Sequence, residues 1–213
     1  LYKIQKFFFF SLNTLQEIKK MLSFKSNSLS WIELVINKLN RNKVLNLTNI
    51  STVLFGSIIL IISAKIKVDL YPVPMTLQPL AVLMIGMLYG RNLATATIGL
   101  YILQGIAGLP VFAYGGGLLY LFGPTGGFII GFFIAGLILG ELADRGWGRN
   151  IVSAIFCMIL GMFIIYSFGI LQLSVIKGFE FAIIKGFYPF LIGDLYKLLV
   201  AGILVPFIWK LAK

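Results

Sequence analysis

Histidine is absent from this chain of 213 residues, and cysteine occurs once, as Cys157. A single cysteine excludes a disulfide bond within the chain. Without histidine or a group of cysteines, the usual ligands of zinc and haem are missing, so we expect no metal site. Charged residues make up only 12% of the chain, which is about half of their share in soluble domains. The low charge therefore argues against a soluble protein.

Motifs for catalysis and for phosphate binding are also missing. The pattern Gly-x4-Gly-Lys-Ser/Thr does not occur, so the chain is expected neither to bind nor to hydrolyse ATP itself. No nucleophile with a basic partner and no pair of acids is evident, so we do not expect an enzyme. No basic stripe with interleaved aromatic residues predicts binding to nucleic acid.

Hydrophobic residues, in contrast, make up 59% of the chain, and the mean hydropathy is +0.98. A bilayer core takes about 20 helical residues to cross, and apolar runs of about that length occupy most of residues 51–211. The sequence predicts an all-α integral membrane protein, in which residues 51–213 form one domain of six transmembrane helices. The predicted spans are about residues 51–66, 77–89, 93–109, 125–142, 151–171 and 187–211.

Residues 1–50 form a separate, basic region with eight Lys or Arg residues and two acids. Apolar residues at helical spacing in 12–21 and 31–39 are typical of short helices on a membrane surface. The content of Asn, Lys and Ser fits a disordered tail equally well. A cleaved signal peptide is not expected, because the apolar segment at 7–10 is short and no small-residue cleavage site follows it.

The distribution of Lys and Arg predicts how the helices are oriented. With the N-terminus in the cytoplasm, 13 of these residues lie inside and four lie outside, while Lys197 falls within a span. Cytoplasmic loops are normally enriched in Lys and Arg, so both termini are predicted to be cytoplasmic. Three loops, at 67–76, 110–124 and 172–186, then face outward.

Two charges, Asp194 and Lys197, interrupt the last apolar run. Each charge costs about 2.5–3.5 kcal/mol inside a membrane helix, and intramembrane charges usually serve a function. Their i, i+3 spacing places both on one helix face, where each partly neutralises the other. A self-paired couple that only faces the bundle is one interpretation. The favoured interpretation is a polar ligand site between the midplane and the outer side of the membrane.

Two other segments carry groups that can complete such a site. The loop 110–124 contains Tyr114 and three consecutive glycines, which let the backbone approach a ligand closely. These glycines are Gly115, Gly116 and Gly117. Flexibility of the loop is the alternative explanation. Gln78, at the outer start of the second span, has an amide that both donates and accepts hydrogen bonds. Together these groups predict a pocket for a small, polar, partly apolar molecule.

Four motifs in these segments resemble the BioY family, the biotin-binding S components of energy-coupling-factor transporters. They are Pro-Val-Pro-Met-Thr-Leu-Gln-Pro-Leu at 72–80, Gly-Leu-Pro-Val-Phe-Ala-Tyr-Gly-Gly-Gly at 108–117, Gly-Pro-Thr-Gly-Gly-Phe at 123–128 and Asp-Leu-Tyr-Lys at 194–197. The resemblance covers about residues 51–211. It implies an S-component-like bundle of six helices in a bacterial plasma membrane, with biotin held near the outer face. The biotin-binding residues that it implies are Asp194, Lys197, Gln78, Tyr114, Gly115 and Gly116.

The same resemblance implies partners. The chain would bind biotin with high affinity, without a cofactor of its own, as the substrate-specific subunit beside a transmembrane coupling protein and two ATPase subunits that use ATP. S components often dock through small residues on the first helix, although the usual Ala-x3-Ala pattern is absent here. The candidates are Gly56, Ser57, Ser63 and Ala64. Ordinary helix packing explains small residues as well.

Two alternatives to this function stay open. One is an S component for another vitamin, such as thiamine or riboflavin. The other is a solitary biotin carrier that works without an ATPase.

Overall fold

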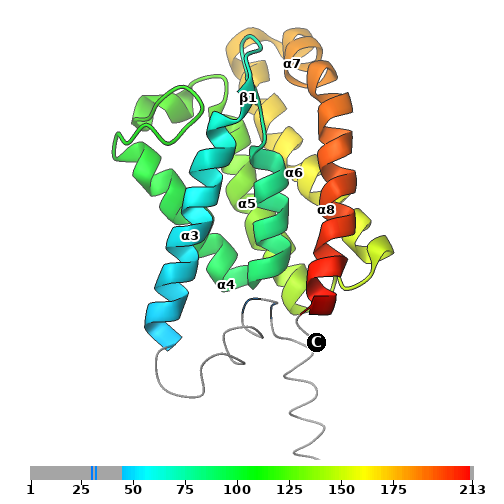
Figure 1. Ribbon diagram of the computed structural model, residues 1–213. Helices are drawn as coiled ribbons and strands as arrows, with labels where there is room; N and C mark the ends of the chain where they lie inside the picture. The colour runs from blue at the N-terminus through cyan, green and yellow to red at the C-terminus, as the bar shows by residue number, and fades with distance from the viewer. Residues whose placement is uncertain (1–29, 31, 33–44, 212–213) are drawn as a thin grey trace, which may run out of the picture.

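The computed structural model describes Ser30, Ile32 and residues 45–211. Its elements are α3 (Leu45–Lys65), β1 (Lys67–Val68), β2 (Met75–Thr76), α4 (Gln78–Ile106), the 3-10 helix η1 (Leu118–Phe122), α5 (Gly126–Asp144), α6 (Ile151–Lys177), α7 (Phe179–Gly186), the 3-10 helix η2 (Tyr188–Phe190) and α8 (Leu191–Leu211). The long helices form a bundle (Figure 1). α3 begins six residues before the predicted domain boundary at residue 51. The predicted surface helices at 12–21 and 31–39 lie outside the described residues, apart from Ile32.

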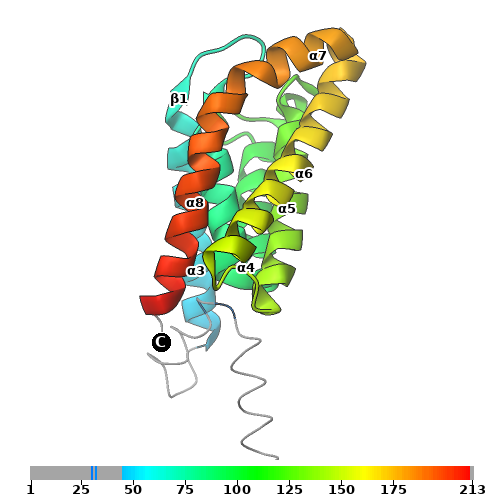
Figure 2. The same ribbon diagram turned by 90° about the vertical axis from the view of Figure 1, so that its right-hand side faces the viewer.

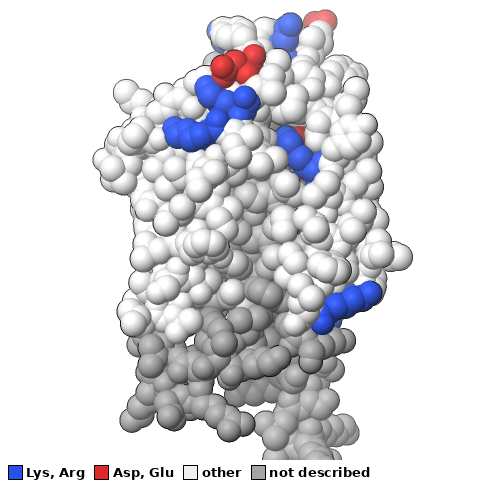
Figure 3. All heavy atoms as spheres, in the orientation of Figure 1, with Lys and Arg blue, Asp and Glu red and all other residues white. Residues whose placement is uncertain are grey.

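Five helical segments among the described residues are long and apolar enough to cross a membrane. They are Leu47–Lys65, Gln78–Ile106, Gly126–Asp144, Ile151–Lys177 and Phe179–Leu211. In Figure 3, most of the charged side chains gather near the end that carries β1, and a broad band below it is almost free of charge. The predicted helical membrane bundle is therefore confirmed. The additions to the predicted spans within the described residues are a small antiparallel sheet, in which Lys67 pairs with Thr76, the helix α7 and the two 3-10 helices.

α4 consists of two arms that meet at Gly90. The backbone there has φ 75° and ψ 174°, a conformation that glycine adopts at little cost. The Nε2 atom of Gln78 lies 2.7 Å from the hydroxyl of Tyr101, 23 residues away. A straight helix would separate these residues by roughly 35 Å. The chain therefore reverses at Gly90, and the predicted spans 77–89 and 93–109 correspond to the two arms, which descend and rise in Figure 1.

Glycines let α5 pack closely against its neighbours. A Cβ atom on Gly136 would lie 2.1 Å from Ile98 Cδ1 on α4, and one on Gly127 would lie 2.3 Å from the carbonyl oxygen of Phe168 on α6. Close contact of this kind suits a membrane, where van der Waals packing drives helix association in the absence of a hydrophobic effect. α5 thus holds α4 and α6 together in one core.

We expect Gly127→Ala to lower the thermal stability of the protein. The new methyl group would meet the Phe168 carbonyl, and overpacking typically costs about 1–3 kcal/mol. Gly99→Ala is the matched control, because a Cβ atom there would meet only Phe133 Cε2 at 3.5 Å. Alanine also favours a helix over glycine. The measurement is thermal unfolding of both variants in one detergent, and equal unfolding temperatures would contradict the expectation.

Local signals set both ends of α6. The side chain of Asn150 accepts a hydrogen bond of 2.8 Å from the backbone N–H of Ser153, as a helix N-cap does. Gly178 ends the helix with φ 89°, in the left-handed region that favours glycine. α6 therefore continues six residues beyond the predicted end at residue 171. α7 follows at once, so most of the predicted outer loop 172–186 is helical.

The four small residues predicted to dock a partner lie on the buried side of α3. Ser57 and Ala64 are fully buried, and Ser63 is 4% exposed. A Cβ atom on Gly56 would lie 2.7 Å from Thr97 Cγ2 of α4. Helix packing thus accounts for the position of all four residues, and their role in docking a partner stays a prediction. The exposed side of α3 carries large apolar residues instead, namely Leu54, Phe55, Ile58 and Ile62.

Candidate ligand-binding site

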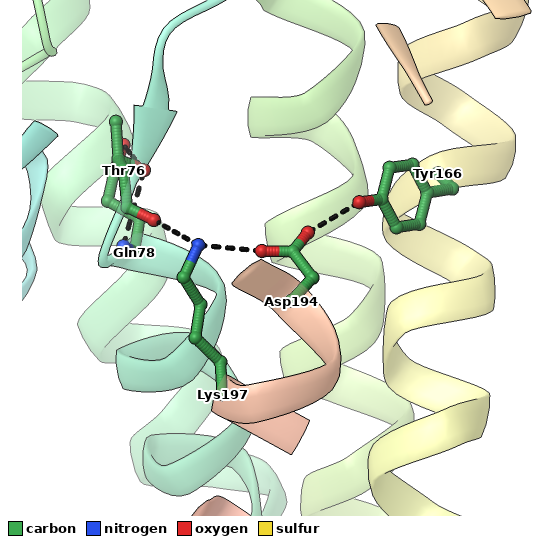
Figure 4. Close-up of polar contacts among 5 residues, drawn as sticks. All are labelled: Thr76, Gln78, Tyr166, Asp194 and Lys197. Carbon is green, nitrogen blue, oxygen red and sulfur yellow. Dashed lines mark hydrogen bonds and ion pairs between the residues drawn. The ribbon is translucent and has the colours of Figure 1, made fainter. Parts of the chain in front are cut away.

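Asp194 and Lys197 form an ion pair near the start of α8 (Figure 4). The Nζ atom of Lys197 lies 2.6 Å from Asp194 Oδ1 and donates a second hydrogen bond, of 2.7 Å, to the backbone carbonyl of Thr76 on β2. The other carboxylate oxygen of Asp194 accepts a hydrogen bond from the hydroxyl of Tyr166 on α6. The two charged side chains are only 8% and 11% exposed. Both charges are therefore paired, as buried charges need to be.

The pair lies closer to the helix end than the sequence predicts. α8 begins at Leu191, after η2, rather than at residue 187, so Asp194 falls in its first turn. The positive end of the helix dipole stabilises a carboxylate there, by about 0.3–1 kcal/mol at exposed sites and up to about 2 kcal/mol at partly buried ones. The dipole, Lys197 and Tyr166 together offset the cost of burying Asp194.

Gln78 faces the pair from the first turn of α4. It is 5% exposed, and its Nε2 atom donates to the hydroxyl of Tyr101. Its backbone N–H donates to Thr76 Oγ1 at 3.2 Å, which fixes the chain where β2 passes into α4. Figure 4 shows Thr76 and Gln78 on one side of the Lys197 ammonium group and Asp194 on the other. The predicted amide and the predicted charge pair thus belong to one site.

These side chains line a cavity of about 550 Å³, a volume that includes its open mouth. Within it, the centre of a water-sized sphere can reach about 50 Å³. Aromatic rings make up much of the wall, and they belong to Phe112, Tyr120, Phe128, Phe132, Tyr166 and Phe190. The cavity offers a carboxylate acceptor, an ammonium donor and an amide within an apolar surround. Among the residues that the structure describes, no group of three His, Cys, Asp or Glu could hold a metal ion.

The predicted glycines lie outside this cavity. A Cβ atom on Gly116 would lie 2.0 Å from the carbonyl oxygen of Leu109, so Gly116 is required for close packing of the loop on itself. The carbonyl of Gly115 accepts a hydrogen bond of 2.8 Å from the backbone N–H of Phe112. Phe112 and Ala113 line the cavity in their place. The glycines therefore shape the loop that presents these two residues.

Tyr114 also points away from the cavity and is 53% exposed. Its hydroxyl donates to Asp69 Oδ1 at 2.8 Å, and the Lys67 ammonium group lies 3.4 Å from the centre of its ring. Hydrogen bonds from Lys67 and Tyr114 hold the pKa of the Asp69 carboxyl below its usual value. These three residues, here called the outer clamp, join the loop that contains β1 to the loop that contains Tyr114.

The lowered pKa of Asp69 predicts how the outer clamp depends on pH. A carboxyl with a lowered folded-state pKa stabilises the clamp above the ordinary Asp pKa of about 3.9, and that contribution is lost as pH falls through the folded-state value. We expect the hydrogen-exchange protection factors of residues 110–117 to be constant from pH 7 to about pH 5 and to fall below about pH 4. Asp69→Asn should lower protection already at pH 7. Protection equal to that of the wild type at pH 7 would rule out the clamp.

Tyr166 is a site residue that is absent from the sequence-based prediction. The sequence carries a signal for it, because a hydroxyl in an apolar span needs a polar partner. That partner, Asp194, lies 28 residues further along the chain and on another helix. Only the packing of α6 against α8 brings the two together.

A bundle of membrane-spanning helices around a cavity of aromatic rings, donors and acceptors defines a membrane protein that binds a small molecule. The chain belongs to the BioY family, whose model, described as "BioY family", matches residues 37–213. This confirms the membership predicted from the four motifs.

Relatives with assigned names support this membership. The "Probable biotin transporter BioY" of Pyrococcus horikoshii is 36% identical over 144 residues, which cover 67% of this chain and 85% of that protein. The "Biotin transporter BioY" of Thermotoga maritima is 35% identical over 152 residues, which cover 71% and 79% of the two chains. The crystal structure of "the S-component for biotin from an ECF-type ABC transporter" matches with a TM-score of 0.71, covering 80% of this chain and 95% of that one. At 22% identity, this last match shows a shared fold.

Proposed function

We propose that this chain binds biotin for uptake across the cell membrane, as the substrate-specific subunit of an energy-coupling-factor transporter. Membership of the BioY family supports this function, as do the names of the two relatives and of the crystal structure with the same fold. The observation that carries the proposal is the buried Asp194–Lys197 pair on the wall of an aromatic cavity. The protein is a transport subunit with several membrane spans and not an enzyme.

The chemistry of biotin suits the observed wall. Its ureido group has two N–H donors and one carbonyl acceptor, its rings and valeryl chain are apolar, and its carboxylate lies at the far end. In our proposal Asp194 accepts a hydrogen bond from a ureido N–H, and Lys197 donates to the ureido carbonyl. Gln78 supplies a third polar contact, and the aromatic rings hold the apolar part. Tyr114, Gly115 and Gly116 support the loop beside the cavity, through the outer clamp and close packing.

Biotin methyl ester tests this orientation. The ester removes only the charge at the carboxylate end. We therefore expect its affinity to stay within about threefold of that of biotin, which is a difference in binding free energy of less than about 1 kcal/mol. The competing orientation pairs Lys197 with the carboxylate. A loss of 2 kcal/mol or more, which is about 30-fold in Kd, would falsify the ureido assignment. Isothermal titration of the purified protein with both compounds gives the comparison.

We also propose six membrane crossings, with both termini in the cytoplasm. The reversal of α4 at Gly90 supports two crossings within that element. In this orientation 13 Lys and Arg residues lie on the cytoplasmic side and four lie outside, as the usual bias of membrane proteins favours. The cavity then opens outward. Cys157 is the only cysteine, so single cysteines introduced on a Cys157→Ser background can be labelled from outside. Lys177→Cys should react with an impermeant maleimide in intact cells and Arg145→Cys should not; the reverse pattern would invert the topology.

The proposed partners are a transmembrane coupling protein and two ATPase subunits, which supply the energy of transport. Titration of the purified chain with biotin, thiamine and riboflavin tests the ligand. Nanomolar binding of biotin alone supports the proposal, and tight binding of another vitamin in its place contradicts it. Uptake of biotin by cells with and without the ATPase subunits tests the partners. Uptake that is equal in both cells would indicate a solitary carrier.

A further inference from the structure

A groove on the membrane-facing side of the bundle lies directly behind the binding cavity. Two adjoining hollows form it, and both are lined by Phe163, Tyr166 and Phe187. We call it the α6–α8 groove. Tyr166 and Asp194 line the first hollow and also line the cavity. The hydrogen bond between these two residues is therefore part of a wall that the groove and the cavity share.

The groove exists because α6 and α8 are close only toward one end. A Cβ atom on Gly202 of α8 would lie 2.9 Å from Ile155 Cγ1 of α6, so the two helices pack tightly there. Figure 2 shows the helices diverging from that end and α7 bridging them at the other. The side chains along the gap are apolar and outward-facing: Phe163 is 68% exposed, and Ile192 is 74% exposed. At this position in a membrane span they face lipid chains.

The length and the polarity of the groove match one phospholipid. Ser174, in the second hollow, lies eleven residues beyond Phe163 on α6, which is roughly 16 Å of helix. One leaflet of a hydrocarbon core of about 30 Å is about 15 Å thick. The exposed Lys177 follows on the same helix face, while Glu180 and Lys185 on α7 balance each other in charge.

We propose that the α6–α8 groove binds an anionic phospholipid. Its acyl chain lies between α6 and α8 against the ring of Tyr166, and its headgroup phosphate accepts a hydrogen bond from the exposed ammonium group of Lys177. The ring of Phe187, whose centre is 5.0 Å from that of Tyr166, closes the groove toward α7. A chain in this place keeps Tyr166 packed where its hydroxyl donates to Asp194. The lipid therefore raises the affinity of the cavity for its ligand, a consequence that rests on the proposed function.

The experiment compares phosphatidylglycerol with phosphatidylcholine in nanodiscs that hold the full chain. Leu195→Trp fills the groove, and Ile203→Trp is its matched control. Leu195 and Ile203 share α8 and are 57% and 58% exposed, but only Leu195 lines the groove. By native mass spectrometry, we expect the wild type and Ile203→Trp to retain phosphatidylglycerol at least about fivefold more than Leu195→Trp does. Ile192→Trp provides a second groove-filling variant if Leu195→Trp does not fold.

Equal retention of phosphatidylglycerol by the groove-filling and control variants would contradict the proposal that the α6–α8 groove binds the lipid. Lys177→Gln should abolish the preference for phosphatidylglycerol over phosphatidylcholine, and an unchanged preference would overturn the headgroup contact. We expect biotin to bind the wild type about fivefold more tightly in phosphatidylglycerol, and Leu195→Trp to bind it equally in both lipids. If the wild type binds biotin with the same affinity in both lipids, the proposed coupling between lipid binding and biotin binding is wrong. Failure of the wild type to bind biotin in either lipid contradicts the proposed function and leaves the lipid result standing.

Discussion

Lys197→Met is expected to raise the Kd for biotin at least about 30-fold, because removing one partner of a buried, hydrogen-bonded charge pair costs about 2–5 kcal/mol. Methionine keeps the apolar stem but donates nothing to Asp194 or to the Thr76 carbonyl. The carboxylate would then be buried without a cation, which typically destabilises a protein by about 3–5 kcal/mol. Isothermal titration and thermal unfolding measure the two effects separately.

Two further variants separate binding from stability. Lys210→Met changes an exposed lysine on the same helix and should leave both measurements unchanged. The double variant Asp194→Asn/Lys197→Met has no unpaired charge, so it should regain much of the lost stability without regaining affinity. If Lys197→Met or Asp194→Asn alone binds biotin as the wild type does, the pair does not belong to the binding site.

Gln78→Leu is expected to weaken biotin binding by about 10- to 100-fold, because a polar group left unpaired in a buried site costs about 1–3 kcal/mol. Leucine has a similar size but offers no donor or acceptor to the ligand or to Tyr101. The measurement is again titration with biotin, with circular dichroism as the check on folding.

Thr76→Val is the matched control for Gln78→Leu. The residue lines the same cavity and is 8% exposed, but its contact with Lys197 is made by the backbone carbonyl, which valine keeps. We expect its biotin affinity to stay within about threefold of the wild type, since the two side-chain hydrogen bonds that are lost, both to Gln78, are long at 3.2 and 3.4 Å. Equal losses in the two variants would show that this end of α4 matters only for folding.

The Asp194–Lys197 pair can be read from the sequence, because its signal is local. Two charges in an apolar run stand out, and helical spacing alone places them on one face. The hydroxyl of Tyr166 and the carbonyl of Thr76 could not be assigned in this way. They reach the pair across 28 and 121 residues, through the packing of separate elements. The helical spans follow from local hydropathy for the same reason, whereas the packing of α4, α6 and α8 around the cavity does not.

The loop residues show where residue type is insufficient. Phe112 is 1% exposed and lines the cavity, while Tyr114, two positions later, is 53% exposed and belongs to the outer clamp. A bridge between Phe112 and Gly115 turns the chain back at this point, so the side on which each ring lies depends on backbone geometry. Small residues on α3 present the same difficulty. Their size suits contact with α4 and contact with a partner equally. Only the structure shows that they are buried within the bundle.

The hydrogen bond from Lys197 to the Thr76 carbonyl has a consequence for biosynthesis. It closes a chain segment of 121 residues. Closing a long segment costs conformational entropy, and this cost is offset only when the last helix packs against the rest. Chains emerge from the ribosome N-terminus first, and their early parts begin to fold before the rest is made. All of the chain that precedes α8 is therefore synthesised before Lys197, the residue that supplies the cation. In the proposed function, the ligand site is complete only after residue 197 has been made, so a chain that stops before residue 194 would lack both charges of that site.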